Sequence, residues 1–138
     1  MMERGVRWAV FSLVSGVVLY GLFRPTSPEM IFEHSDKVGH VIAFLFLALT
    51  GRWALFKYSK LGFWLSMFVL AFLLEFLQGQ VRPLRLFSME DAYANGVGVL
   101  LALVVCTIYK YNNKKSLNIS ESFGSHFDPL KQSLKLIK

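Results

Sequence analysis

The chain contains a single cysteine and little charge, and both scarcities exclude classes of protein. Cys106 lies inside an apolar run, so the sequence has neither a disulfide framework nor the paired cysteines of a zinc site. Charged residues make up 17% of the 138 residues and hydrophobic residues 54%, including 13 phenylalanines. A soluble domain of this length has too little interior to bury so much apolar surface. The composition therefore predicts a membrane protein, with the lipid bilayer as its first partner.

Motifs for cofactors and activated nucleophiles are also missing, since we find neither a glycine-rich phosphate loop nor a nucleophile elbow. No histidine or cysteine has the spacing of a zinc site. We therefore expect no cofactor and no metal. The net charge of +6 would suit nucleic acid, but the basic residues are scattered and gather only beside apolar runs. Membrane proteins place basic residues in that way, so we expect no nucleic-acid partner.

Four apolar stretches are present, at about residues 6–23, 38–56, 61–78 and 91–109. A hydrocarbon core of about 30 Å needs roughly 20 helical residues, and each stretch comes close to that length. The sequence therefore predicts an all-α fold, an integral membrane bundle of four transmembrane helices over residues 1–110. Residues 111–138 are polar and basic, and their composition predicts a flexible cytoplasmic tail.

Basic residues predict the orientation of the bundle, because lysine and arginine are more abundant in cytoplasmic loops. Eleven of the 15 lie at the N-terminus, near residues 52–60 and in the tail. The other four lie in the two remaining loops and are Arg24, Lys37, Arg82 and Arg85. We expect both termini to be cytoplasmic and the loops around residues 24–37 and 79–90 to face outward.

The unusual polar residues of the spans occupy the outward ends of three helices. Spacings of three or four residues place each group on one helical face. The groups are Asp36 and His40 on the second span, Glu75 and Gln78 on the third, and Asp91 and Asn95 on the fourth. A charged side chain facing lipid near mid-span costs ~2.5–3.5 kcal/mol. We therefore expect Glu75 to point inward, toward Lys37, Arg85 or His40.

The fourth span carries two further local signals. Ser88 is well placed as an N-cap with Asp91 at the third helical position, which is a capping-box arrangement. Ala94, Gly98 and Ala102 form a stripe of small residues that permits close approach of another helix. Ser12 and Gly16 of the first span are the candidates to face it.

The three polar groups together resemble the VanZ-like family of small bacterial membrane proteins. The pattern is D-K-x-x-H, then E-x-x-Q, then R-x-x-S-x-x-D-x-x-x-N-x-x-G, and it covers about residues 30–105. Its residues here are Asp36, Lys37, His40, Glu75, Gln78, Arg85, Ser88, Asp91, Asn95 and Gly98. The resemblance implies a multi-pass helical bundle in the bacterial cytoplasmic (inner) membrane. The founding member of the family is associated with antibiotic resistance, namely reduced susceptibility to the glycopeptide teicoplanin.

Two functions and one purely structural role are compatible with these residues. In the first function, all of them except Gly98 form an outward-facing site that binds a lipid or a lipid-linked cell-envelope precursor without catalysis. In the second, the chain is a small intramembrane enzyme acting on a lipid-linked phosphate, with His40 as acid–base and Glu75 and Asp91 as further catalytic candidates. In the structural role, the polar groups clamp helices together and His40 hydrogen-bonds Asp36 or Glu75. The missing nucleophile and cofactor motifs favour the first function.

Overall fold

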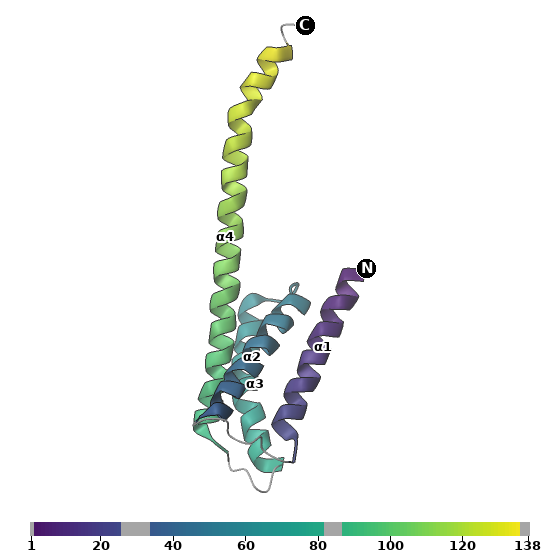
Figure 1. The fold of residues 1–138 in the computed structure, drawn as a ribbon, viewed down its shortest axis with the longest axis vertical. Helices are drawn as coiled ribbons and strands as arrows, with labels where there is room; N and C mark the ends of the chain where they lie inside the picture. The colour runs from purple at the N-terminus through teal and green to yellow at the C-terminus, as the bar shows by residue number, and fades with distance from the viewer. Residues whose placement is uncertain (1, 26–33, 82–86, 136–138) are drawn as a thin grey trace. The chain divides into compact units, whose positions relative to one another are not determined.

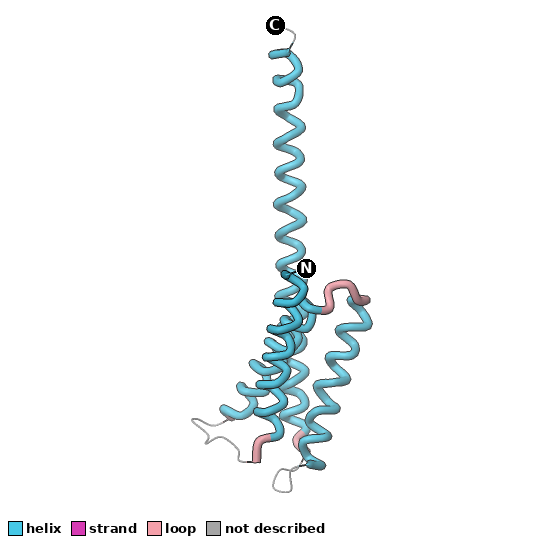
Figure 2. Tube along the Cα trace, turned by 90° about the vertical axis from the view of Figure 1, so that its right-hand side faces the viewer, coloured by secondary structure: helices cyan, strands magenta, loops and turns pink. Residues whose placement is uncertain are grey.

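The computed structural model describes residues 2–25, 34–81 and 87–135, and every regular element in this part of the chain is an α-helix (Figure 1). The helices are α1 (Met2–Phe23), α2 (Ser35–Ala54), α3 (Lys60–Val81) and α4 (Met89–Lys135). A short connection at residues 55–59 joins α2 to α3, and Figure 2 draws such loops in pink. The predicted all-α fold is confirmed, and each of the four apolar stretches corresponds to one helix.

The chain divides into two compact units, Met1–Val104 and Val105–Lys138. The first unit holds α1, α2, α3 and the first part of α4, and all of the predicted site residues belong to it. The second unit is the remainder of α4, which stays helical through Lys135. The flexibility expected of residues 111–138 stays a prediction.

Within the described residues, three helical segments are long and apolar enough to cross a membrane: Glu3–Phe23, Lys60–Val81 and Met89–Ser116. Their apolar side chains are largely exposed, as Leu65, Val69 and Phe72 on α3 illustrate at 57%, 66% and 50%. An apolar surface of this kind is stable when lipid covers it, which supports a membrane protein. Helix α2 is not among the three, because Asp36 and Lys37 in its first turn and Arg52 in its last turn make it more polar.

The core of the first unit lies where α2, α3 and α4 meet. It contains Phe44 and Ala48 from α2, Met67 and Ala71 from α3, and Val99 and Ala102 from α4. Val18 and Leu22 of α1 complete it at the side of α2. The small side chains of Ala48, Ala71 and Ala102 are 0–2% exposed, so the helix backbones approach closely there.

Helix α4 approaches the backbone of α2 closely at Gly98. A Cβ built on Gly98 would collide with the backbone oxygen of Val41 and would lie 3.0 Å from the backbone nitrogen of Leu45. The close approach predicted for the small-residue stripe is therefore confirmed. The predicted partner was wrong, because Gly98 meets α2, while a Cβ built on Gly16 of α1 would have no neighbour within 4 Å.

Candidate functional site

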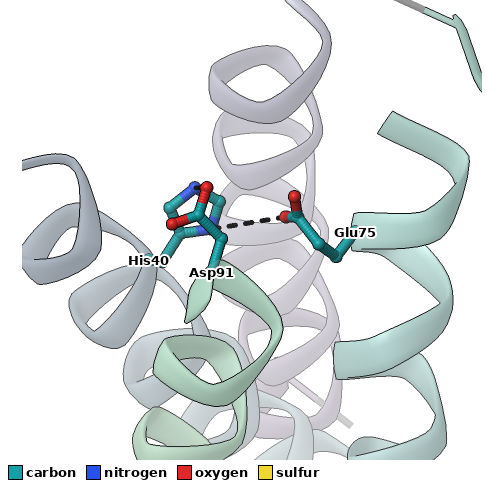
Figure 3. A group of neighbouring side chains, drawn as sticks. All are labelled: His40, Glu75 and Asp91. Atoms are coloured by element: carbon teal, nitrogen blue, oxygen red, sulfur yellow. Dashed lines mark ion pairs between the residues drawn. The ribbon is translucent and has the colours of Figure 1, made fainter. Parts of the chain in front are cut away.

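Five polar side chains from three helices lie buried together in the first unit, and we call them the polar cluster. They are His40 from α2, Glu75 and Gln78 from α3, and Asp91 and Asn95 from α4. Their exposed fractions range from 0% to 7%, so none of them faces the lipid or water directly. Glu75 therefore points inward, as its position in an apolar run predicted. Figure 3 shows three of these side chains turned toward one another.

Asn95 links the three helices that carry the polar cluster. Its Nδ2 donates a hydrogen bond of 3.1 Å to the backbone oxygen of Ala71 on α3. The amide oxygen Oδ1 is then the acceptor for His40, whose Nδ1 lies 2.9 Å away. Nδ1 must therefore carry the proton, because an amide oxygen cannot donate. The expected hydrogen bond of His40 to Asp36 or Glu75 is replaced by this bond to Asn95.

The imidazole ring of His40 lies between two carboxylates (Figure 3). Its Nδ1 is 4.0 Å from Oε2 of Glu75, and its Nε2 is 3.8 Å from Oδ2 of Asp91. Both distances exceed those of hydrogen bonds, so the carboxylates act on the ring mainly by charge. Each ring nitrogen of His40 therefore has a carboxylate oxygen within 4.0 Å. This arrangement is suited to acid–base chemistry.

The same three residues are the candidates to hold a cation. One ligand atom from each of His40, Glu75 and Asp91 can be chosen so that all lie within 4.8 Å of one another. One imidazole nitrogen and two carboxylate oxygens would suit a transition metal. The bond to Asn95 engages Nδ1 of His40, so Nε2 would be the imidazole atom that binds such a cation. The absence of a metal, expected from the sequence, stays a prediction.

Gln78 connects the polar cluster to the end of α1. Its Nε2 donates a hydrogen bond of 2.5 Å to the backbone oxygen of Leu22. Its Oε1 is buried and has no hydrogen-bond partner among the described residues. A buried amide oxygen of this kind lacks the donor that such atoms normally have. The Nε2 atom of Gln78 is therefore hydrogen-bonded within the protein, and its Oε1 atom could accept a hydrogen bond from a ligand.

The remaining predicted residues lie beside the cluster rather than in it. Nζ of Lys37 is 2.9 Å from Oε2 of Glu90 and 4.0 Å from Oδ2 of Asp36, so its ion pairs are with these residues and not with Glu75. Ser88 Oγ accepts a hydrogen bond of 3.2 Å from the backbone nitrogen of Asp91, which confirms the predicted N-cap. Arg85 lies outside the described residues.

A groove of about 530 Å³ runs between α1 and α2 and reaches the polar cluster at one end. Its apolar part is lined by Leu13, Val14 and Val17 of α1 and by Ile42, Ala43 and Phe46 of α2. Its polar end is lined by Arg24, Asp36, His40 and Gln78. The volume falls within the roughly 300–1,000 Å³ typical of small-molecule sites.

The sequence did not predict this groove. It did not predict a role for Arg24, and it missed the pairing of Glu90 with Lys37. Gly21 and Gly39 also line the groove, and these two glycines within helices were the available signal in the sequence. Comparison with models of protein families, with curated proteins and with solved structures finds no match.

Proposed function

We propose that the chain is a four-span, VanZ-like protein of the bacterial cytoplasmic membrane that binds a lipid or a lipid-linked cell-envelope precursor. The observation that carries this proposal is the polar cluster, whose His40 and Gln78 also line an apolar groove. An amphiphile matches a site that is apolar along its length and polar at one end. The family assignment is supported by the motif residues of the sequence.

Helix α2 is the fourth span in this proposal. Its 20 residues span about 30 Å at 1.5 Å per residue, which matches the hydrocarbon core. It packs beside α1 and against Gly98 of α4, and both of these helices include segments apolar enough to cross. The polar residues of its first turn would then lie at the outer interface, since both termini are proposed to be cytoplasmic.

A structural clamp alone is a poor account of the polar cluster. Burying ionisable groups costs solvation that their mutual attraction often fails to recover. Ionisable residues inside membrane spans are functional candidates for that reason. Here two carboxylates and an imidazole are at most 7% exposed, and the imidazole borders the groove. Ligand binding explains why such residues lie at the end of an apolar groove.

A small intramembrane enzyme is the second candidate. The observation that favours it is the orientation of His40, whose Nδ1 donates to Asn95 while Nε2 lies 3.8 Å from Asp91. A ring held by a hydrogen bond at one nitrogen, with a carboxylate near the other nitrogen, is the arrangement of a general acid–base. In that case a lipid-linked phosphate would react at the polar end of the groove, with Arg85 and Lys37 binding the phosphate.

Native mass spectrometry of the full chain with co-purified lipids tests the binding proposal. We expect one lipid to remain bound after delipidation in detergent, and His40→Gln to reduce its retention while the fold survives. A structural clamp predicts lower thermal stability in His40→Gln with no specific loss of lipid. If the protein is an enzyme, His40→Gln should slow lipid turnover by roughly 10²–10⁴-fold.

Reporter fusions test the proposed orientation. A periplasmic reporter fused after residue 30 should be active, and the same reporter fused after Lys60 or Lys115 should be inactive. If the reporter is instead inactive after residue 30 and active after Lys60 and Lys115, the polar cluster lies at the inner face. That result would contradict a site for extracytoplasmic envelope precursors.

A further inference from the structure

The groove between α1 and α2 has an open apolar floor because of two glycines. A Cβ built on Gly21 of α1 or on Gly39 of α2 would have no heavy atom within 4 Å, although both residues line the groove. Because glycine has no side chain, these two positions leave unfilled space, unlike Gly98, where the helices are in tight contact. The space lies next to His40, where the groove meets the polar cluster.

The polar end of the groove contains two buried atoms that need partners. Nε of Arg24 is a buried donor, and Oε1 of Gln78 is a buried acceptor. Neither has a hydrogen-bond partner within residues 2–25, 34–81 and 87–135. Gln78 of α3 donates to the backbone of Leu22, two positions before Arg24, so both groups lie near the C-terminal end of α1. A ligand there must accept at one point and donate at another.

The charges at this end select the type of headgroup. Arg24 contributes a guanidinium, which matches the oxygens of a phosphate. Asp36 contributes a carboxylate to the same lining, with its Oδ2 4.0 Å from Nζ of Lys37. Lys37 also forms an ion pair of 2.9 Å with Glu90, so the charges at this end include both signs in equal number. A headgroup with negative charge alone would meet Asp36 unfavourably. A headgroup that combines a phosphate with an ammonium complements Arg24, Gln78 and Asp36. Its phosphate can accept from Arg24, and its ammonium can donate to Oε1 of Gln78 and is attracted by Asp36.

We propose that the groove binds one acyl chain of a phosphoethanolamine lipid, with its phosphate at Arg24 and its ammonium at Gln78 and Asp36. This inference rests on the proposed lipid-binding function and assigns the lipid class and its position. The second acyl chain stays in the surrounding bilayer. The lipid would reach the polar cluster from the side, through the gap that Gly21 and Gly39 leave open.

The glycines permit a test in which the groove is filled without disturbing the fold. Gly39→Leu and Gly21→Leu place a side chain in the groove, and Gly16→Leu is the matched control, since Gly16 lies on α1 outside the lining with nothing within 4 Å. Leucine has the higher helix propensity, so all three variants should remain folded. In native mass spectrometry we expect both groove variants to retain about tenfold less phosphatidylethanolamine, and Gly16→Leu to match wild type.

Headgroup selection is tested with phosphatidylethanolamine and phosphatidylglycerol of identical acyl chains. Wild type should retain the first about tenfold better, because one charge-assisted hydrogen bond corresponds to roughly that factor. Arg24→Gln should weaken retention of both lipids, whereas its control, the exposed Arg4→Gln, should not. Asp36→Asn should shift the preference toward phosphatidylglycerol, since the carboxylate that disfavours an anionic headgroup is gone. These headgroup variants test the site even if a groove variant fails to fold.

Each of the following results would overturn all or part of the inference. The groove assignment is wrong if Gly39→Leu and Gly21→Leu retain lipid as Gly16→Leu does, or if a second copy of the chain occupies the groove. The headgroup assignment is wrong if wild type retains both lipids equally. If the groove variants bind normally but His40→Gln loses lipid, the proposed function survives and its site lies elsewhere in the cluster. If wild type retains no lipid at all, the proposed function and this inference fail together.

Discussion

Replacement of Gly98 by alanine should separate α4 from α2. The new Cβ would meet the backbone oxygen of Val41 and would lie 3.0 Å from both the nitrogen of Leu45 and the Cβ of Phe44. The Val41 oxygen and the Leu45 nitrogen belong to helix backbone, which cannot rotate away as a side chain can. Overpacking of this kind typically costs about 1–3 kcal/mol. The His40–Asn95 bond, close to this contact on the same two helices, should lengthen as the helices move apart.

Gly96→Ala is the matched control for this prediction. Gly96 lies on the same helix, and a Cβ built there would have no neighbour within 4 Å. Both substitutions gain the same helix propensity, roughly 0.8–1 kcal/mol for alanine over glycine. That gain cancels when the two variants are compared, so their difference reports the contact with α2. We expect Gly98→Ala to be about 1–3 kcal/mol less stable than Gly96→Ala.

The measurement is reversible unfolding of the full chain in mixed detergent micelles, titrated with sodium dodecyl sulfate and followed by circular dichroism. Gly96→Ala should unfold at the same or a higher detergent fraction than wild type, and Gly98→Ala at a lower one. A difference in unfolding free energy below about 0.5 kcal/mol would show that α2 and α4 do not touch at Gly98, because even mild overpacking exceeds it.

The same unfolding assay checks three further predictions. Asn95→Ala removes both bonds of the bridging amide and should cost about 1 kcal/mol, since interhelical hydrogen bonds average roughly 0.6 kcal/mol each; an unchanged midpoint would contradict the bridge. Ser88→Ala should cost about 1 kcal/mol through loss of the N-cap, and restored stability in Ser88→Asp would support that cause. A double-mutant cycle with Lys37→Met and Glu90→Gln should give a coupling of no more than about 1 kcal/mol that shrinks in high salt, because the Glu90 side chain is 72% exposed. A larger, salt-independent coupling would mean that lipid shields the pair.

Much of the fold follows from local properties of the sequence. Apolar runs near 20 residues predict helices, and a spacing of three or four residues predicts which side chains share a face. Glu75 illustrates this, because a carboxylate in an apolar helix must turn toward polar neighbours, and it does so at 0% exposure. Ser88 is a second case, since an N-cap depends on a few consecutive residues. Helix α2 was predicted from its apolar middle, although charged residues lie in its first and last turns.

The sequence by itself determined the helices, their apolar character and the polar face of each. Only the tertiary structure decided which faces meet: Gly98 against α2 rather than α1, His40 with Asn95 rather than Asp36, and Lys37 with Glu90. The groove and the role of Arg24 within it also emerged only there. The physical reason is that helix periodicity is local, whereas the rotation of each helix and its choice of neighbour depend on backbone approach at small residues and on hydrogen bonds such as that of Asn95 to Ala71. Residues far apart in the chain make those contacts, so no pattern within a single helix encodes them.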